Sequence, residues 1–246
     1  MQAHLFCARL PYAGAIAGPA RMAPSPNLHL EVAARGWDHA GWNGQFYPET
    51  LPSEWRLTYY SNEFHRVLVP ARQAAAADAG LIAQWREDVH SQFRFLIELR
   101  IDADQQMPDA HQLQRLQDGL GALLGGVLVS MPASARAAFV PLRRAVDQPV
   151  AVYVDADPSL EQACAELIGQ AGAGLCWRPA RAGAARRLGL LQADEVTHGL
   201  RQLRAHIEEF LGQAPATDEL LLVFEGSPPA LDAMNEAKVI ASLLGV

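Results

Sequence analysis

Lysine is almost absent from this chain of 246 residues. Lys238 is the only lysine among 20 basic residues, and all the others are arginines. A Schiff base, a lysine general base or a lysine-dependent phosphate loop would each have to use Lys238, which falls in the last helical stretch. The shortage therefore excludes most lysine-dependent chemistry before any motif is considered.

Other scarcities exclude further classes of protein. The three cysteines, Cys7, Cys164 and Cys176, are widely spaced and form no C-x-x-C pair, which excludes a zinc ribbon and favours a reducing cytoplasm over a disulfide scaffold. The longest uncharged run, residues 119–135, contains the pair Gly125 and Gly126 and a proline, Pro132, and is too interrupted to span a membrane. With a net charge of −7 and no basic cluster, the chain is a poor candidate for nucleic-acid binding. We expect a cytoplasmic protein without nucleic-acid or membrane partners.

Acidic residues are missing from the first thirty residues, which are rich in alanine, glycine and proline. Pro11, Gly14 and Pro19 interrupt any apolar stretch that could serve as a secretory signal. We therefore expect residues 1–27 to be a disordered or loosely attached extension. Translation from Met22, with the upstream residues as an annotation artefact, is the alternative.

Apolar runs of strand length alternate with helical patterns from Leu28 onward. The runs predict strands at Leu28–Ala34, Arg66–Val69, Phe93–Ile101, Gly126–Met131, Val150–Asp155, Gly174–Trp177, Arg187–Leu191 and Leu220–Phe224. The helical patterns predict helices near Pro52–Phe64, Ala71–Val89, Pro108–Leu124, Ala133–Val146, Pro158–Gln170, Asp194–Gly212 and Pro229–Leu244.

This alternation predicts an α/β fold with parallel strands and right-handed crossovers. Eight strands in ~220 residues fit a TIM-like (β/α)8 barrel, for which about 250 residues is typical. An open doubly wound sheet is the alternative, but the sequence after the first strand, AARG, is no glycine fingerprint. We expect one barrel domain over residues 28–246.

The segment from Gly36 to Pro52, GWDHAGWNGQFYPETLP, resembles the opening signature of the YecE-like proteins, the family catalogued as domain of unknown function 72 (DUF72). That signature reads G-W-x-Y, then W, then F-Y-P-x-x-L-P. The resemblance continues more weakly to Phe224. It implies a TIM-barrel-like fold and leaves the reaction open, because the activity of the family is not established.

The chain departs from the family pattern mainly at polar strand ends. Leu68 stands where the family usually has a carboxylate, and Pro70 where it has an asparagine. Glu98 occupies the position of a usual lysine, and Ser130 that of a glutamine. Because leucine can neither give nor accept a proton, these changes favour loss of the family's original activity; the alternative is that a different set of residues now performs another function.

Acidic residues and one histidine after predicted strands are the candidates for chemistry. His39, next to Asp38 in the first loop, is the histidine best placed for proton transfer, although exposed loop histidines are common. Asp102 and Asp155 each begin an Asp-x-Asp pair after a strand, and together they could hold a divalent metal. The alternative is that these aspartates only solvate loops or cap helices.

Aromatic and arginine side chains are the candidates for ligand binding. Trp37, Trp42 and Tyr47 crowd the first βα loop, where they could stack on a sugar or base, or simply fold the loop over the barrel rim. Arg100 and Arg187, near the ends of the third and seventh strands, could clamp an anion.

Two functions remain open at this point. The favoured one is a non-catalytic accessory protein that binds a small anionic or sugar-like ligand, with no cofactor. The alternative is a hydrolase or isomerase at the barrel mouth that depends on acid–base groups or on a divalent metal. The sequence leaves the oligomeric state undetermined.

Overall fold

Eight parallel strands form the frame of the computed structural model. The structure describes residues 28–101, 109–132, 134, 136–147, 149–156, 168–181, 183, 186–196, 199–215 and 219–246. The strands are β1 (His29–Arg35), β2 (Arg66–Val69), β3 (Arg94–Arg100), β4 (Leu124–Met131), β5 (Ala151–Ala156), β6 (Gly174–Leu175), β7 (Leu188–Leu191) and β8 (Glu219–Phe224).

The strands curve into a nearly closed barrel. Their order in the sheet is β6-β5-β4-β3-β2-β1-β8-β7, and all neighbours are parallel. The two ends of this sheet meet where Trp177, just after β6, pairs with Gly189 on β7. The Trp177 amide donates to the Leu188 carbonyl at 2.8 Å, and the Leu190 amide donates back to the Trp177 carbonyl at 2.9 Å. The predicted TIM-like fold is therefore confirmed.

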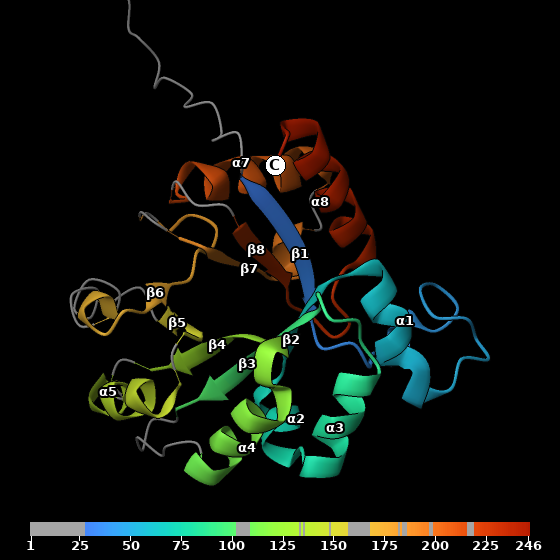
Figure 1. Cartoon of the computed structure of the whole chain (residues 1–246). Helices are drawn as coiled ribbons and strands as arrows, with labels where there is room; N and C mark the ends of the chain where they lie inside the picture. The colour runs from blue at the N-terminus through green and yellow to red at the C-terminus, as the bar shows by residue number, and fades with distance from the viewer. Residues whose placement is uncertain are drawn as a thin grey trace, which may run out of the picture.

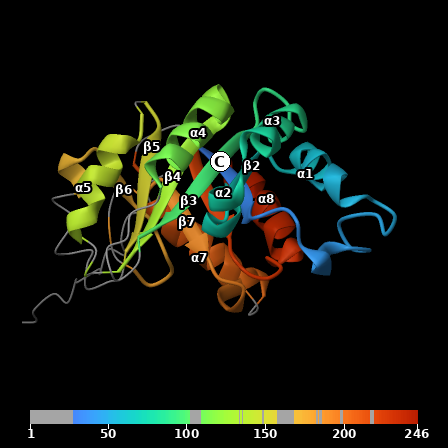
Figure 2. The same cartoon turned by 90° about the horizontal axis from the view of Figure 1, so that it is seen from below.

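Helices cover the outside of the barrel (Figures 1 and 2). The α-helices are α1 (Arg56–Glu63), α2 (Ala71–Ala76), α3 (Ala79–Glu87), α4 (Ala110–Leu120), α5 (Arg136–Ala145), α7 (Leu200–Gly212) and α8 (Leu231–Leu244). Short 3-10 turns are η1 (Ala40–Trp42), η2 (Ser53–Trp55), η3 (Gly121–Leu123) and η5 (Asp194–Val196). In Figure 1, α2 and α4 lie beside β2–β4, and α7 and α8 lie beside β1 and β8. Within the described residues, no helix has the length and apolar character needed to cross a membrane.

Alternation along each strand divides the apolar residues between two layers. On β3, Phe95, Ile97 and Leu99 face the helices, while Leu96 faces the barrel interior. The interior is filled by one buried cluster: Ala33, Leu68, Leu96, Leu128, Cys176, Leu188, Leu190, Leu221 and Val223. Burial on both faces explains why the strands are continuous apolar runs in the sequence.

The predicted helix over Ala71–Val89 is two helices in the structure. The α2 helix stops at Ala76, and α3 begins after Asp78, whose carboxylate accepts a hydrogen bond from the Leu81 amide at 2.8 Å. This N-cap satisfies a backbone donor that would otherwise be unpaired at the start of α3. The periodicity of the apolar residues did not reveal the break, because both helices pack on the same side of the barrel.

The region after Asp194 also differs from the prediction. Asp194 begins the short turn η5 and not a continuous helix, and α7 starts only at Leu200. Its N-cap is Gly199, which has a φ of 90°. Glycine adopts a positive φ more readily than other residues, so Gly199 allows the chain to turn just before α7 begins.

Lys238 is not simply a solvated charge. Its ammonium group donates to the Glu63 carbonyl at 3.0 Å and lies 4.8 Å from the centre of the Phe64 ring. The one lysine therefore joins α8 to the end of α1.

Candidate functional site

Polar side chains form a layer at the carboxyl end of the barrel, directly above its apolar interior. Each is two residues beyond an interior position, so that the same alternation brings it to the inner face. Arg35 follows Ala33, Glu98 follows Leu96, and the full layer is Arg35, Glu98, Ser130, Asp155, Arg178, Gln192 and Glu225. We call this layer the mouth. Active sites of TIM barrels lie at this end.

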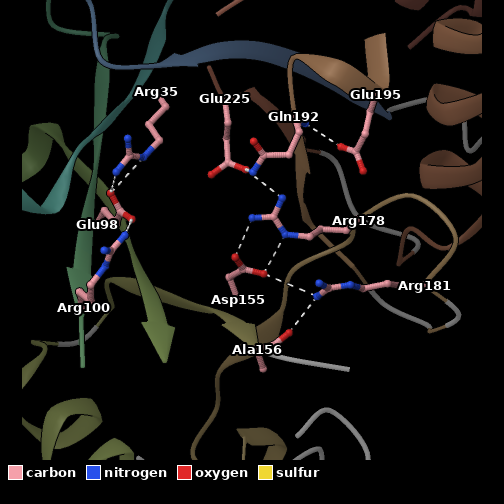
Figure 3. A network of polar contacts seen from close by, with 10 residues as sticks. All are labelled: Arg35, Glu98, Arg100, Asp155, Ala156, Arg178, Arg181, Gln192, Glu195 and Glu225. Atoms are coloured by element: carbon pink, nitrogen blue, oxygen red, sulfur yellow. Dashed lines mark hydrogen bonds and ion pairs between the residues drawn. The ribbon is translucent and has the colours of Figure 1, made fainter. Parts of the chain in front are cut away.

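Arg178, which follows β6, organises one side of the mouth (Figure 3). Its Nε and Nη2 donate to the two carboxylate oxygens of Asp155 at 3.0 and 2.7 Å. Its Nη1 donates to Glu225 Oε2 at 2.8 Å, and Gln192 Nε2 donates to the same oxygen at 2.6 Å. Bidentate pairing of this kind fixes the planes of both groups. One arginine therefore orients side chains from β5 and from the end of β8.

Arg181 adds a second guanidinium beside Asp155. Its Nη1 donates to the Ala156 carbonyl at 2.8 Å and lies 3.6 Å from Asp155 Oδ1. Asp155 thus lies between two arginines, which balance its charge.

Glu98 and Arg35 form the opposite side of the mouth in Figure 3. Arg35 Nε and Nη2 donate to Glu98 Oε2 at 3.1 and 2.5 Å, and the Ala71 amide donates to the same oxygen at 3.0 Å. The other oxygen of Glu98 lies 3.7 Å from Arg100 Nη2. Glu98, which stands where the family usually has a lysine, is therefore held by Arg35 at the end of β1.

Burial and charge shift the pKa values of the Arg178 network. Burial raises the pKa of Glu225 above its usual range, although the charge and hydrogen bond of Arg178, and more weakly the charge of Arg35, act to lower it. Burial works against the charged form of Arg178, but the hydrogen bonds and charges of Asp155 and Glu225 outweigh it and raise the pKa of Arg178. The influence of Arg35 on Glu225 indicates that the two sides of the mouth act on each other electrostatically.

The aromatic residues of the first βα loop are packed in the interior of the protein. Trp37, Trp42 and Tyr47 are only 1–5% exposed. Trp42 Nε1 donates to the Pro229 carbonyl at 3.1 Å, and the Tyr47 hydroxyl donates to the Trp37 carbonyl at 2.5 Å. In this arrangement none of the three rings presents a face to a ligand, and their contacts are those of a loop folded over the barrel rim.

Asp38 and His39 do not form a pair for proton transfer in this structure. The Asp38 carboxylate accepts from Arg56 Nη1 and is half exposed. His39 Nε2 donates to the Arg35 carbonyl at 3.1 Å, since a carbonyl can only accept. Burial lowers the pKa of His39, although hydrogen bonds to Arg35 and Gly36 oppose the shift. The two neighbours in sequence are therefore directed to different partners.

Of the two aspartates predicted to bind a metal, Asp155 and Asp102, only Asp155 lies within the described residues. Asp155 is engaged by arginines through both oxygens, whereas Asp102 lies outside the residues that the structure describes. Across the described part of the chain, no group of three or more His, Cys, Asp or Glu side chains is arranged to hold a metal ion. A divalent cation at Asp155 would have to displace Arg178.

Arg100 and Arg187 lie at opposite ends of the barrel. Arg100 is the last residue of β3, at the mouth, while Arg187 precedes β7 and lies at the amino end. The predicted clamp by both arginines on one anion is therefore incompatible with the fold. Only Arg100 remains close to the mouth.

Arg178 and Glu225, the two residues that organise the mouth, were not among the site residues predicted from the sequence. Arg178 and Glu225 each directly follow a predicted strand, as Asp155 ends one. Position relative to the strand ends was the available signal. This position does not reveal which residues pair with one another, because Asp155 is 23 residues from Arg178 and Arg178 is 47 residues from Glu225.

Comparison with known proteins agrees with the fold. A family model described as "Protein of unknown function DUF72" matches residues 31–209. Two solved structures of DUF72 family proteins are similar to the chain. The protein from Thermotoga maritima MSB8 has a TM-score of 0.62 at 14% identity, over 86% of this chain and 98% of that one. The protein from Enterococcus faecalis V583 has a TM-score of 0.61 at 11% identity, over 87% and 96%. A comparison with curated proteins finds no match.

Proposed function

The chain belongs to the DUF72 family of proteins of unknown function, and from this premise we propose that its barrel mouth binds a small anionic or sugar-like ligand without transforming it. The observation that carries the proposal is the Asp155–Arg178–Glu225 network, together with Arg35 on the facing side. Each of the carboxylates Glu98, Asp155 and Glu225 is already matched to an arginine.

The arginines of the mouth retain hydrogen-bonding capacity after these pairs are made. A guanidinium has five N–H groups. Within the described residues, the contacts of Arg178 use three of them and those of Arg35 use two. Both groups are held in place before a ligand arrives, which reduces the entropy lost on binding.

The charge of the mouth also favours an anion. Arg35, Arg100, Arg178 and Arg181 face three carboxylates, Glu98, Asp155 and Glu225. Among the side chains that the structure describes here, these four positive and three negative charges leave an excess of one positive charge, on a chain whose net charge is −7. The amide of Gln192 and the hydroxyl of Ser130 add neutral groups suited to sugar hydroxyls.

Titration calorimetry at fixed ionic strength tests this function with ribose 5-phosphate and its neutral counterpart, ribose. We expect the phosphate-bearing sugar to bind at least about tenfold more tightly, a difference of about 1.4 kcal/mol. Arg181→Gln should weaken its binding, whereas Arg204→Gln should not, because Arg204 pairs with Glu208 on the outer helix α7. Equal binding of the two sugars, or equal loss in both variants, would contradict the proposal.

The alternative is an acid–base hydrolase or isomerase that uses Glu225. The raised pKa of this buried carboxyl group is the observation in its favour, since a general acid must keep its proton near neutral pH. Incubating the bound sugar phosphate with the protein and following it by NMR separates the two functions. A product that forms with the wild type and not with Glu225→Gln would establish the enzyme and exclude simple binding.

A further inference from the structure

A cavity of about 170 Å³ lies beside the mouth, between α2, the end of β3 and α4. It exists because α2 presents only small side chains here. Ala71, Ala74 and Ala75 recur at helical spacing on the face of α2 that lines the cavity. Three methyl groups leave a space that larger side chains would fill.

The walls of this cavity are mainly apolar, and their polar groups are satisfied. Besides the alanines, Leu99, Leu113 and Leu116 line it. Gln112 also lines the cavity, but its amide nitrogen donates to the carbonyls of Ala74 and Ala77 at 2.8 and 2.7 Å, and its oxygen accepts from Arg115. Apart from the charged groups at one side, the wall of the cavity therefore suits a hydrocarbon chain.

Charged groups lie on one side of the cavity, toward the mouth. Glu98, Arg100 and Asp109 line it, and the Arg100 side chain is 61% exposed. The Asp109 carboxylate accepts from the His111 amide at 3.0 Å at the start of α4. Within the described residues, the ion pair of Arg100 is with Glu98, whose Oε1 is 3.7 Å away, beyond hydrogen-bond distance. The charge of Glu98 is balanced on its other oxygen by Arg35. Arg100 thus has a guanidinium available for an anion at the edge of an apolar space.

We propose that this cavity binds a short aliphatic carboxylate, with the chain between α2 and α4 and the carboxylate on Arg100. A volume of about 170 Å³ is roughly that of six water molecules in the liquid, which corresponds to a chain of about four to five carbons including the carboxylate. The cavity adjoins the mouth and shares Glu98 and Arg100 with it, but its apolar walls between α2 and α4 take no part in the sugar binding proposed for the mouth.

Ligand-detected NMR with acetate, butanoate, pentanoate and octanoate tests the proposal at constant ionic strength. We expect affinity to rise about fourfold with each methylene up to pentanoate, the gain that burial of one such group provides. Octanoate should lose this gain because the cavity is too short for it. Pentanamide, which has the same chain without the charge, should bind more weakly than pentanoate.

Two pairs of variants locate the site. Ala74→Leu fills the cavity and should abolish pentanoate binding, whereas Ala76→Leu, on the exposed face of the same helix, should not. Arg100→Gln should remove the preference for pentanoate over pentanamide, whereas Arg72→Gln, also exposed on α2, should keep it. Ala75→Leu narrows the cavity at an exposed position and replaces Ala74→Leu if that variant does not fold.

The outcomes separate this site from the mouth. Ribose 5-phosphate binding should survive Ala74→Leu, and pentanoate binding should survive Arg181→Gln. An affinity that does not depend on chain length, or pentanoate binding that persists in both Ala74→Leu and Ala75→Leu, would overturn the proposal. So would an unchanged preference for pentanoate over pentanamide in Arg100→Gln.

Discussion

At the carboxyl end of the barrel Arg178 holds Asp155 and Glu225, whereas at the amino end Arg66 holds Glu219. The same alternation of strand residues creates both pairs, because Arg66 is two residues before the interior residue Leu68 and Arg178 is two residues after Cys176. The ends differ in burial. Asp155 and Glu225 are 18% and 13% exposed, and Glu219 is 54% exposed.

The hydrogen-bond partners of the two arginines also differ between the two ends of the barrel. Arg66 donates to the backbone carbonyls of His65 and Gln92 as well as to Glu219, so that it ties the entries of neighbouring strands together. Arg178 donates only to carboxylates among its described partners. We infer that the amino end uses arginine for stability and the mouth uses it to hold an array of charges, as the two ends of TIM barrels generally do.

Removal of Arg178 should have the largest effect on stability. Arg178→Met leaves the largely buried Glu225 without a guanidinium and Asp155 with Arg181 alone, and breaking such a buried pair costs about 3 kcal/mol. Urea unfolding followed by circular dichroism measures the loss. Adding Asp155→Asn and Glu225→Gln to the variant should recover part of it. A loss below about 1 kcal/mol would mean that the mouth resembles an exposed surface pair.

A change of pH should lower the free energy of unfolding less than Arg178→Met does, because Glu225 keeps its partner Arg178. The folded-state pKa of Glu225 is raised by burial above the ordinary value of 4.5. The folded state therefore binds the proton more tightly than the unfolded state, and this stabilisation is full below pH 4.5 and lost as the pH rises through the folded-state pKa.

The free energy of unfolding of the wild type and of Glu225→Gln, measured from pH 4 to pH 7, checks this sign. We expect wild-type stability to fall relative to the variant as the pH rises. A difference that stays constant, or that grows in the opposite direction, would contradict a folded-state pKa of Glu225 that burial raises.

At the amino end, Arg66→Met should cost about 1 kcal/mol, since Glu219 remains solvated when its partner is lost. The comparison with Arg178 becomes sharper in salt. In 1 M NaCl the Debye length is about 3 Å, so the contribution of the exposed Arg66 pair should shrink while that of the buried Arg178 network persists. Unfolding of both variants at low and high salt measures this, and equal salt dependence would remove the distinction between the two ends.

The smallest effect is expected for His29→Ala. His29 lies 3.1 Å from Glu31 at the amino end, and its side chain is 63% exposed. We expect a change of at most about 0.5 kcal/mol at neutral pH, as for most surface substitutions. A larger loss in urea unfolding would indicate that the exposed amino end holds charges as firmly as the mouth does.

The strands were predictable because parallel strands buried on both faces must be apolar along their whole length. Arg66–Val69 was predicted with the bounds that β2 has, and the remaining strands shifted by one or two residues at an end. Helix boundaries were harder. The break between α2 and α3 depends on one capping side chain, Asp78, whose role becomes evident only when its hydrogen bond to Leu81 is formed.

The site was predictable only in part. Asp155 and Arg100 were selected from their positions after strands, and both lie at the mouth. Trp42 was selected by the same argument, yet it is 1% exposed and packs against Tyr60 in the protein interior. A large ring after a strand serves equally well to bind a ligand or to cover the barrel rim, and only its packing decides between them.

By itself, the sequence determined the succession of strands and helices that predicts the barrel, because apolar runs and helical periodicity are local properties of the chain. It also determined that arginine, and not lysine, would supply the positive charge of the mouth. The tertiary structure decided the rest: which arginine meets which carboxylate, that Arg187 faces away from Arg100, and that small alanines on α2 leave a cavity beside β3. These features depend on which strands are neighbours and on how closely the helices pack. Both are set when the barrel closes and brings together residues that are far apart in the chain.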